Sequence, residues 1–375
     1  MTNLALINPK ILTWARERAG LTEDLLAERM HVTVEKIISW EEEKNKPTFT
    51  QAQKIAQITH IPFGYFFLEN PPIEKLPIPD LRTVGSTKIQ EPSLDLLDMI
   101  KQVILKQEWY KDYLISQDAK PLPFVGRFNT NSSIYKVAED IRKVLEVPIP
   151  QKGTWEEYQK NLFEGAEAAN ILVMCSGVVG SNNHRKLSVN EFRGFAITDP
   201  IAPLVFINNS DAPTAKLFTL IHELTHIWIG SSGISDLNNH NKVESFCNKV
   251  AGEFLVPKEE IQSIWKPNNE LLINLTEISS KFHVSKLVVA KRAVDLNLLD
   301  VQSYNKFYLT ELKNYKNKNH SGGNYYRTAG VKNSHLLSKT VITEVLSGRL
   351  LYRDAGRLLD INPSKIQAYA NELFK

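Results

Sequence analysis

Apolar residues recur at helical spacing from about residue 8 to residue 68, and the pattern is sharpest between Leu21 and Trp40. Thr22 is suited to the N-cap of a first helix, and a short turn is expected at 30–32. Thr33 is then placed to cap a second helix, whose apolar positions are Val34, Ile37, Ile38 and Trp40. Two short helices joined by such a turn predict a helix-turn-helix unit.

From about residue 170 the pattern changes to short apolar or alternating runs bounded by Gly, Asn, Asp and Pro. These runs predict three strands, at 171–179, 192–198 and 204–208. A helix is expected to begin near Ser210 and to extend through Ile227, and a second helix is expected from about Val243 to Val256. A small sheet packed against helices predicts the α+β class.

Other segments connect or extend these regions. The segment at 71–92 is rich in proline, which removes backbone donors and stiffens the chain, so it is predicted to be a linker. Ser93 then begins a long predicted helix. A second helix-turn-helix pattern at 274–299 is expected to buttress the domain before it, and a polar stretch ending in Gly322-Gly323 predicts a flexible joint.

Composition adds limits on the class of protein. The 375 residues predict two or more domains, and the formal net charge of +3 does not by itself indicate nucleic-acid binding. The last 45 residues are predicted to be helical and hold seven basic and four acidic side chains. Two cysteines, Cys175 and Cys247, are too few for a secreted protein built on disulfides. Without a signal peptide or a long apolar run, we expect a cytoplasmic protein with no membrane association.

The sequence His222-Glu223-Leu224-Thr225-His226 is an HExxH motif within a predicted helix. Histidines four residues apart lie on one helix face, so both imidazoles can bind one Zn²⁺ ion. Glu223 is then placed to take a proton from a water molecule whose pKa zinc lowers. Apolar residues surround the motif, and buried His and Glu side chains without partners are costly, which favours a metal site over an exposed helix face.

A catalytic zinc usually has three protein ligands. The residue six positions after His226 is Ser232, so the third ligand must come from elsewhere. Glu244 and Glu253 both lie in the next predicted helix, nine residues apart and therefore about half a turn out of phase. Glu244 shares its helix face with small and apolar residues, whereas Glu253 shares its face with a lysine and is expected to face solvent. We select Glu244; His240 is the competitor, but it lies in a polar loop.

Two segments resemble signatures of the ImmA/IrrE metallopeptidases. The first is similar to "FTLAHELGH" and reads KLFTLIHELTH at 216–226. The second is similar to "E-x-x-(A/C)-N-x-(F/V)-A-x-x-L-(M/V)-P" and reads ESFCNKVAGEFLVP at 244–257. Phe192 to Phe195 and the strand at 204–208 are similar to the preceding strands of the family. The resemblance covers 165–260 and departs at Thr225, where glycine is commoner.

This resemblance implies a zincin-like domain with His222, His226 and Glu244 as zinc ligands and Glu223 as the catalytic base. It also implies a zinc-dependent endopeptidase that cleaves a partner protein, in this family a transcriptional repressor. The predicted strand at 204–208 precedes the zinc helix and is a hypothetical edge for pairing with an extended substrate.

The expected organisation of this α+β protein has an all-α N-terminal domain, a small sheet packed on helices and a C-terminal helical region. Its segments are a helix-turn-helix domain at 1–70, a proline-rich linker at 71–92, a peptidase domain at 93–265, a helical extension at 266–312, a flexible linker at 313–330 and a C-terminal helical segment at 331–375.

The N-terminal unit is similar to the lambda-repressor-like (Xre) family, whose pattern LT-x-x-x-LA-x-x-x-x-VS-x-x-x-I-x-x-WE matches residues 21–41. The positions expected to contact DNA are Thr33, Val34, Glu35, Lys36 and Ser39. Residues 33–43, however, hold one lysine and four glutamates, and this charge would repel phosphates. DNA reading and protein docking therefore both stay open for this unit.

Alternatives to the peptidase are a DNA-binding regulator or antitoxin-like protein with a sensory or vestigial zinc site, and a docking scaffold. Zinc stoichiometry separates the scaffold from the other two. A Glu223→Gln variant separates the peptidase from the regulator, because it should keep zinc and lose proteolysis.

Overall fold

The computed structural model describes residues 3–72, 93–150, 153–211, 213–231, 240–315 and 325–374. Contacts divide the part of the chain that it describes into two compact units, Met1–Pro77 and Ile78–Lys375. Most of the predicted proline-rich linker, the Gly322-Gly323 joint and Ser232 lie outside the described residues. None of the helices in the described ranges is long and apolar enough to cross a membrane.

The first unit is helical, as the apolar spacing predicted. Its elements are α1 (Pro9–Arg18), α2 (Glu23–Met30), α3 (Val34–Glu41), α4 (Phe49–Thr59) and η1 (Phe63–Phe67). The Thr22 side chain caps α2 by accepting from the backbone N–H of Leu25 at 3.2 Å. Thr33 is the N-cap of α3, although its side chain makes no capping hydrogen bond. The helix-turn-helix unit predicted at this position is confirmed.

The second unit holds a small sheet and many helices. Before and within the sheet region lie α5 (Leu94–Ser116), α6 (Ile134–Leu145), α7 (Trp155–Ala168), β1 (Leu172–Ser176), β2 (Gly194–Ile197) and β3 (Leu204–Asn208). After it lie α8 (Pro213–Trp228), α9 (His240–Leu255), α10 (Lys258–Ile264), α11 (Leu271–Phe282), α12 (Lys286–Asp295) and α13 (Val301–Tyr315). The C-terminal helices are α14 (Tyr325–Asn333), α15 (His335–Leu346), α16 (Tyr352–Leu359), η2 (Pro363–Lys365) and α17 (Ile366–Leu373).

Within the described residues the sheet has three strands, in the order β1-β3-β2. β3 pairs in parallel with β1 and antiparallel with β2, from Gly194 opposite Ile207 to Ile197 opposite Leu204. The hypothesis that the strand at 204–208 offers an edge to substrate is therefore wrong, because both edges of β3 are already paired. Among the strands that the structure describes, the edge strand nearest the HExxH helix is β2, which packs against α8.

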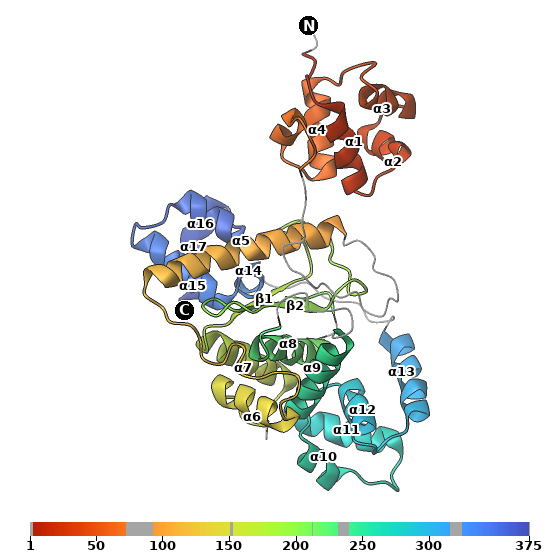
Figure 1. Cartoon of the computed structure of the whole chain (residues 1–375), viewed down its shortest axis with the longest axis vertical. Helices are drawn as coiled ribbons and strands as arrows, with labels where there is room; N and C mark the ends of the chain where they lie inside the picture. Colours follow the sequence, from red (N-terminus) through yellow and green to blue (C-terminus); the bar gives the residue numbers. More distant parts are fainter. Residues whose placement is uncertain are drawn as a thin grey trace. The chain divides into compact units, whose positions relative to one another are not determined.

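Alternate residues of the strands enter two different apolar cores. Val173 and Cys175 of β1 join a core with α6, α7, α8 and α9, whereas Leu172 and Met174 join a core with α5 and the C-terminal helices. Figure 1 shows these two sets of helices on opposite faces of the sheet. Because both faces are covered, β1 and β3 are buried along their whole length, which explains their nearly continuous apolar sequences.

A buried ion pair joins α12 to the end of α9. The Arg292 guanidinium contacts the Glu253 carboxylate and also donates to the backbone oxygen of Val256 at 3.0 Å. Both charged side chains are at most one-tenth exposed. The expectation that Glu253 faces solvent is therefore wrong: its helix face is covered by the 274–299 helices, and Arg292 supplies the cation that a buried carboxylate needs.

Two carboxylates, each with two polar contacts, hold the C-terminal helices on the rest of the second unit. At the start of α15, the Glu167 carboxylate accepts from the Ser334 hydroxyl at 2.6 Å and from the backbone N–H of His335 at 2.8 Å. Between α16 and α17, the Asp360 carboxylate accepts from the buried Lys106 ammonium of α5 at 3.0 Å and from Lys332 at 3.1 Å. The C-terminal segment is thus attached to α5 and α7 by charged groups as well as by its apolar core.

We expect Arg292→Met to lower the free energy of unfolding by about 3–5 kcal/mol, because the variant leaves the Glu253 carboxylate buried without its cation. The matched control is Lys291→Met, which removes the neighbouring exposed pair with Asp295 and should cost less than about 1 kcal/mol. Urea denaturation of both variants measures the two values. Equal losses would contradict the role assigned to the buried pair.

Burial raises the pKa of the Glu167 carboxyl, against the effect of its hydrogen bonds with Ser334 and His335. The folded chain therefore keeps this proton to a higher pH than the unfolded chain does, and the stabilisation from protonation is lost as pH rises through the folded pKa. We expect the unfolding free energy of the wild type, relative to Glu167→Gln, to fall as the pH rises above about 4, where glutamate carboxyls ordinarily lose their proton, towards the raised pKa of Glu167. Glu164→Gln, at an exposed position on the same helix, is the control for the loss of a carboxylate from α7. Parallel pH profiles for wild type and Glu167→Gln would rule the effect out.

Candidate metal centre

Two neighbouring helices bring the predicted ligands together. His222 and His226 lie one turn apart on α8, whose other faces are buried through Leu220, Ile221, Leu224 and Ile227. Glu244 lies on α9, which packs closely against α8. The apolar residues hold the two helices against each other. The three polar side chains therefore lie together on the side of the α8–α9 pair that the apolar residues do not occupy.

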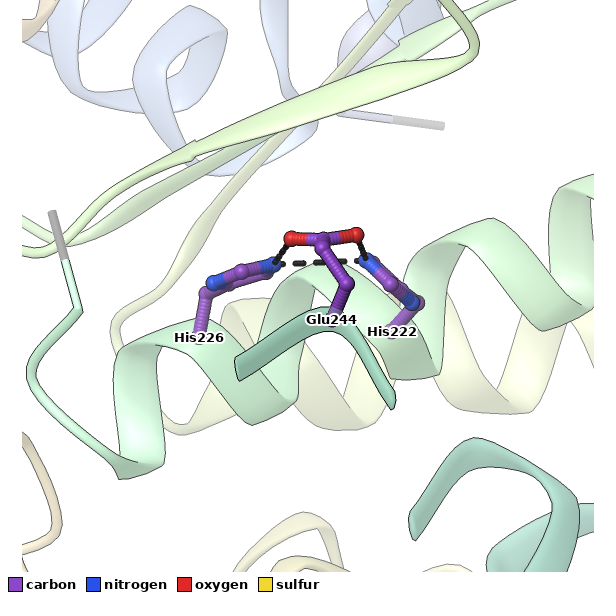
Figure 2. A group of neighbouring side chains, drawn as sticks. All are labelled: His222, His226 and Glu244. Carbon is purple, nitrogen blue, oxygen red and sulfur yellow. Dashed lines mark hydrogen bonds and ion pairs between the residues drawn. The ribbon is translucent and has the colours of Figure 1, made fainter. Parts of the chain in front are cut away.

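The three side chains converge on one point (Figure 2). The Glu244 carboxylate lies 3.0 Å from His222 Nε2 and 3.1 Å from His226 Nε2 through its two oxygens. The two Nε2 atoms are 3.3 Å apart. Each side chain is mostly buried but retains 13 to 20% of its exposure, so the group is open to solvent on one side.

The donor chemistry of this group fits a metal ion. His222 Nδ1 lies 3.0 Å from the amide oxygen of Asn248, which can only accept, so Nδ1 carries the ring proton when the imidazole is neutral. Its Nε2 lone pair then points at the Glu244 carboxylate, which is also an acceptor. A shared cation resolves this conflict. Ligands about 2.1 Å from a tetrahedral ion lie about 3.4 Å apart, close to the separations observed.

Glu223 takes a different position from the three converging residues. Its side chain is 7% exposed and lies against the first residue of β2. A Cβ added at Gly194 would lie 3.2 Å from Glu223 Cγ, 2.6 Å from Thr219 Cγ2 and 2.8 Å from the backbone oxygen of Phe206. Glycine at position 194 thus lets the edge strand approach the HExxH helix directly beside Glu223.

Glu253 pairs with Arg292, away from the converging group. His240 is the first residue of α9, and its side chain lies outside the described part of the chain. The positions expected to contact DNA lie at the start of α3, with Thr33, Glu35 and Lys36 exposed and Val34 and Ser39 half-buried.

Two residues of the candidate centre were not singled out from the sequence. Asn248, which orients His222, lies one turn after Glu244 on α9, so its helical spacing could have identified it. Gly194 makes its contact across the sheet, and no spacing within the sequence indicates that approach.

Comparison with known families matches residues 166–294 to the IrrE N-terminal-like domain of the peptidase M78 family. Residues 12–66 match a helix-turn-helix family, and residues 333–372 match a domain of unknown function (DUF8813). No curated protein matches the chain. The first two matches confirm the similarity to the ImmA/IrrE architecture with an N-terminal helix-turn-helix domain, and they support a metallopeptidase-type enzyme or a regulator.

We expect Asn248→Ala to weaken Zn²⁺ binding about 10- to 100-fold, because His222 loses the acceptor that fixes its ring orientation and tautomer. Competition with a chromophoric chelator measures the change in affinity. Lys249→Ala, the exposed neighbour on the same helix, is the matched control and should bind zinc as the wild type does. An unchanged zinc affinity in Asn248→Ala would contradict the proposed role of this contact.

Proposed function

We propose that this chain is a zinc-dependent endopeptidase that cleaves a regulatory protein, and that its substrate is a transcriptional repressor. The observation that carries the proposal is the convergence of His222, His226 and Glu244 from two helices, with Glu223 beside them on α8. The match of residues 166–294 to the IrrE N-terminal-like domain supports the same reaction class.

His222, His226 and Glu244 would hold the zinc ion. Zinc bound there supplies Lewis-acid chemistry, because it makes a water molecule more acidic and polarises the substrate carbonyl. Asn248 keeps the His222 ring in the tautomer whose Nε2 is free to coordinate.

Glu223 moves the proton in the proposed reaction. Its carboxylate accepts a proton from the attacking water as the water oxygen bonds to the peptide carbonyl carbon. The same group then gives the proton to the amide nitrogen as the C–N bond breaks, which yields a carboxylic acid group on one fragment and an amine on the other. The burial of Glu223, which is 7% exposed, favours this exchange, because the proton is not lost to bulk water.

The outer edge of β2 is suited to bind the substrate backbone. The backbone N–H of Asn208 donates to the oxygen of Arg193, so this pair is hydrogen-bonded, and bonded and non-bonded pairs alternate along the strand. Gly194 and Ala196 therefore direct their backbone groups away from β3. An extended peptide added at this edge would run past Glu223, since Gly194 lies against that side chain.

The helix-turn-helix match in the same chain supports a substrate among transcription regulators, and such a substrate would place the reaction in the cytoplasm. The second candidate is a DNA-binding regulator with a sensory zinc site, which the same match favours. The two candidates differ in one respect: only the peptidase requires Glu223 to exchange a proton.

We expect Glu223→Gln to keep zinc and to lower cleavage about 100-fold or more, because the amide cannot accept the proton. The purified variant is incubated with repressors encoded beside it, with and without a chelator, and the fragments are identified by mass spectrometry. Glu259→Gln, an exposed carboxylate on α10, is the matched control and should cleave at the wild-type rate. Zinc-loaded Glu223→Gln that cleaves normally would reject the mechanism.

A further inference from the structure

The helices α16 and α17 form a helix-turn-helix in the C-terminal segment. Asp360 ends α16 in the left-handed conformation, with φ 52°. The backbone N–H of Ile361 then donates to the oxygen of Gly356 at 3.0 Å, and Asn362 caps the following helical segment through Ser364. A three-residue turn at 360–362 thus joins two short helices that pack on each other and on α15.

This turn has the same local geometry as the turn between α2 and α3. There His31 ends α2 with φ 58°, the N–H of Val32 donates to the oxygen of Ala27 at 3.0 Å, and Thr33 is the N-cap. When the sequences of the two turns are aligned, α3 corresponds to η2 and α17. The turn between α11 and α12, at 283–285, repeats the arrangement around His283 with φ 54°.

The exposed face of α17 carries polar side chains of the kinds that recognise DNA. Residues 361–371 contain one lysine, several amide and hydroxyl side chains and no acidic residue, and the exposed glutamate of α17, Glu372, lies in its last turn. The exposed members are Asn362, Pro363, Ser364, Lys365, Gln367, Ala368 and Asn371. Lysine, glutamine and asparagine are the side chains that recognise base edges in the major groove. The hydroxyl of Tyr352 donates to Gln367 Oε1 at 3.1 Å and orients this amide.

Basic residues flank that face, and nearby acids are already paired. Arg353 and Arg357 of α16 are exposed, and Arg353 Nε lies 3.5 Å from the Asp354 carboxylate in an exposed pair. The Asp360 carboxylate is occupied by the Lys106 and Lys332 ammonium groups, and Glu344 is held by Arg349. Phosphate oxygens approaching α16 would therefore meet guanidinium groups.

The other two helix pairs lack this chemistry. On α3 the positions corresponding to Ser364 and Gln367 are Glu35 and Ile38, and hydrogen bonds from its own backbone N–H and from Thr33 lower the pKa of Glu35. On α12 the arginine is buried in the pair with Glu253, and the exposed Lys291 pairs with Asp295. Among the described helices, α16 and α17 thus combine the turn geometry with a polar face whose first turns, from Asn362 to Asn371, hold no acidic residue.

We propose that the C-terminal helix-turn-helix binds duplex DNA, with α17 in the major groove and Arg353 and Arg357 on the phosphates. This gives a function to the segment that matches a domain of unknown function at 333–372. The proposal does not depend on the peptidase reaction. In this proposal the protein binds DNA through its C-terminal segment. The acidic helix α3 of the N-terminal unit then contacts protein.

The test measures fluorescence anisotropy of a labelled 24-base-pair random-sequence duplex with the full chain, over a series of salt concentrations. Arg353→Ala combined with Arg357→Ala is expected to weaken binding about tenfold and to reduce the salt slope by about two, because two phosphate contacts are lost. Lys339→Ala, which removes an exposed charge from α15, is the matched control and should leave binding unchanged. Thermal unfolding followed by circular dichroism verifies that each variant is folded.

Selection from a random duplex library then tests base reading. Gln367→Ala is expected to reduce the preference for the selected sequence over random duplex about tenfold, while random binding stays the same. Three results overturn the proposal: no duplex binding at low salt; binding lost in Lys36→Ala but kept in the Arg353 and Arg357 double variant; or equal displacement by single-stranded DNA of the same length.

Discussion

The site depends on the electrostatic repulsion between the Nε2 lone pair of His222 and the Glu244 carboxylate. Asn248 fixes the proton of His222 on Nδ1, so two acceptors face each other at 3.0 Å across the α8–α9 interface. Such a pair is repulsive in a mostly buried setting unless a cation lies between them. The apolar faces of α8 and α9 hold the helices in this register, so packing energy keeps the ligand atoms together before any ion binds.

The same packing explains why so small a sheet can support a site. With helices on both faces, β3 is buried throughout, and the position of α8 is fixed by the strand that leads into it. The helices α14 to α17 supply part of one cover, and the charged contacts of Glu167 and Asp360 attach them to α7 and α5. The C-terminal segment is therefore part of the body that positions the HExxH helix, and the DNA-binding face proposed for it belongs to that same body.

Local patterns in the sequence were sufficient for much of this structure. The helix-turn-helix, the three strands and the two site helices follow from apolar spacing, and the HExxH spacing identifies two imidazoles on one face. The predictions that the structure contradicts concern contacts between segments that are distant in the sequence. The helix neighbour Lys249 indicates solvent around Glu253, but the cation that contacts Glu253 is Arg292, which lies 39 residues further along the chain. The sequences of the three strands do not give their order in the sheet, so they do not indicate that β3 is the central strand.

Glycine at position 194 limits how the edge strand β2 can vary beside the HExxH helix. A Cβ there would lie 2.6 Å from Thr219 Cγ2 on α8 and 2.8 Å from the Phe206 carbonyl oxygen on β3, so a larger residue fits only if the strand or its neighbours shift. In the proposed peptidase such a shift would move the edge of β2 relative to Glu223. The distance between a bound peptide backbone and the carboxylate that exchanges its proton would then change as well.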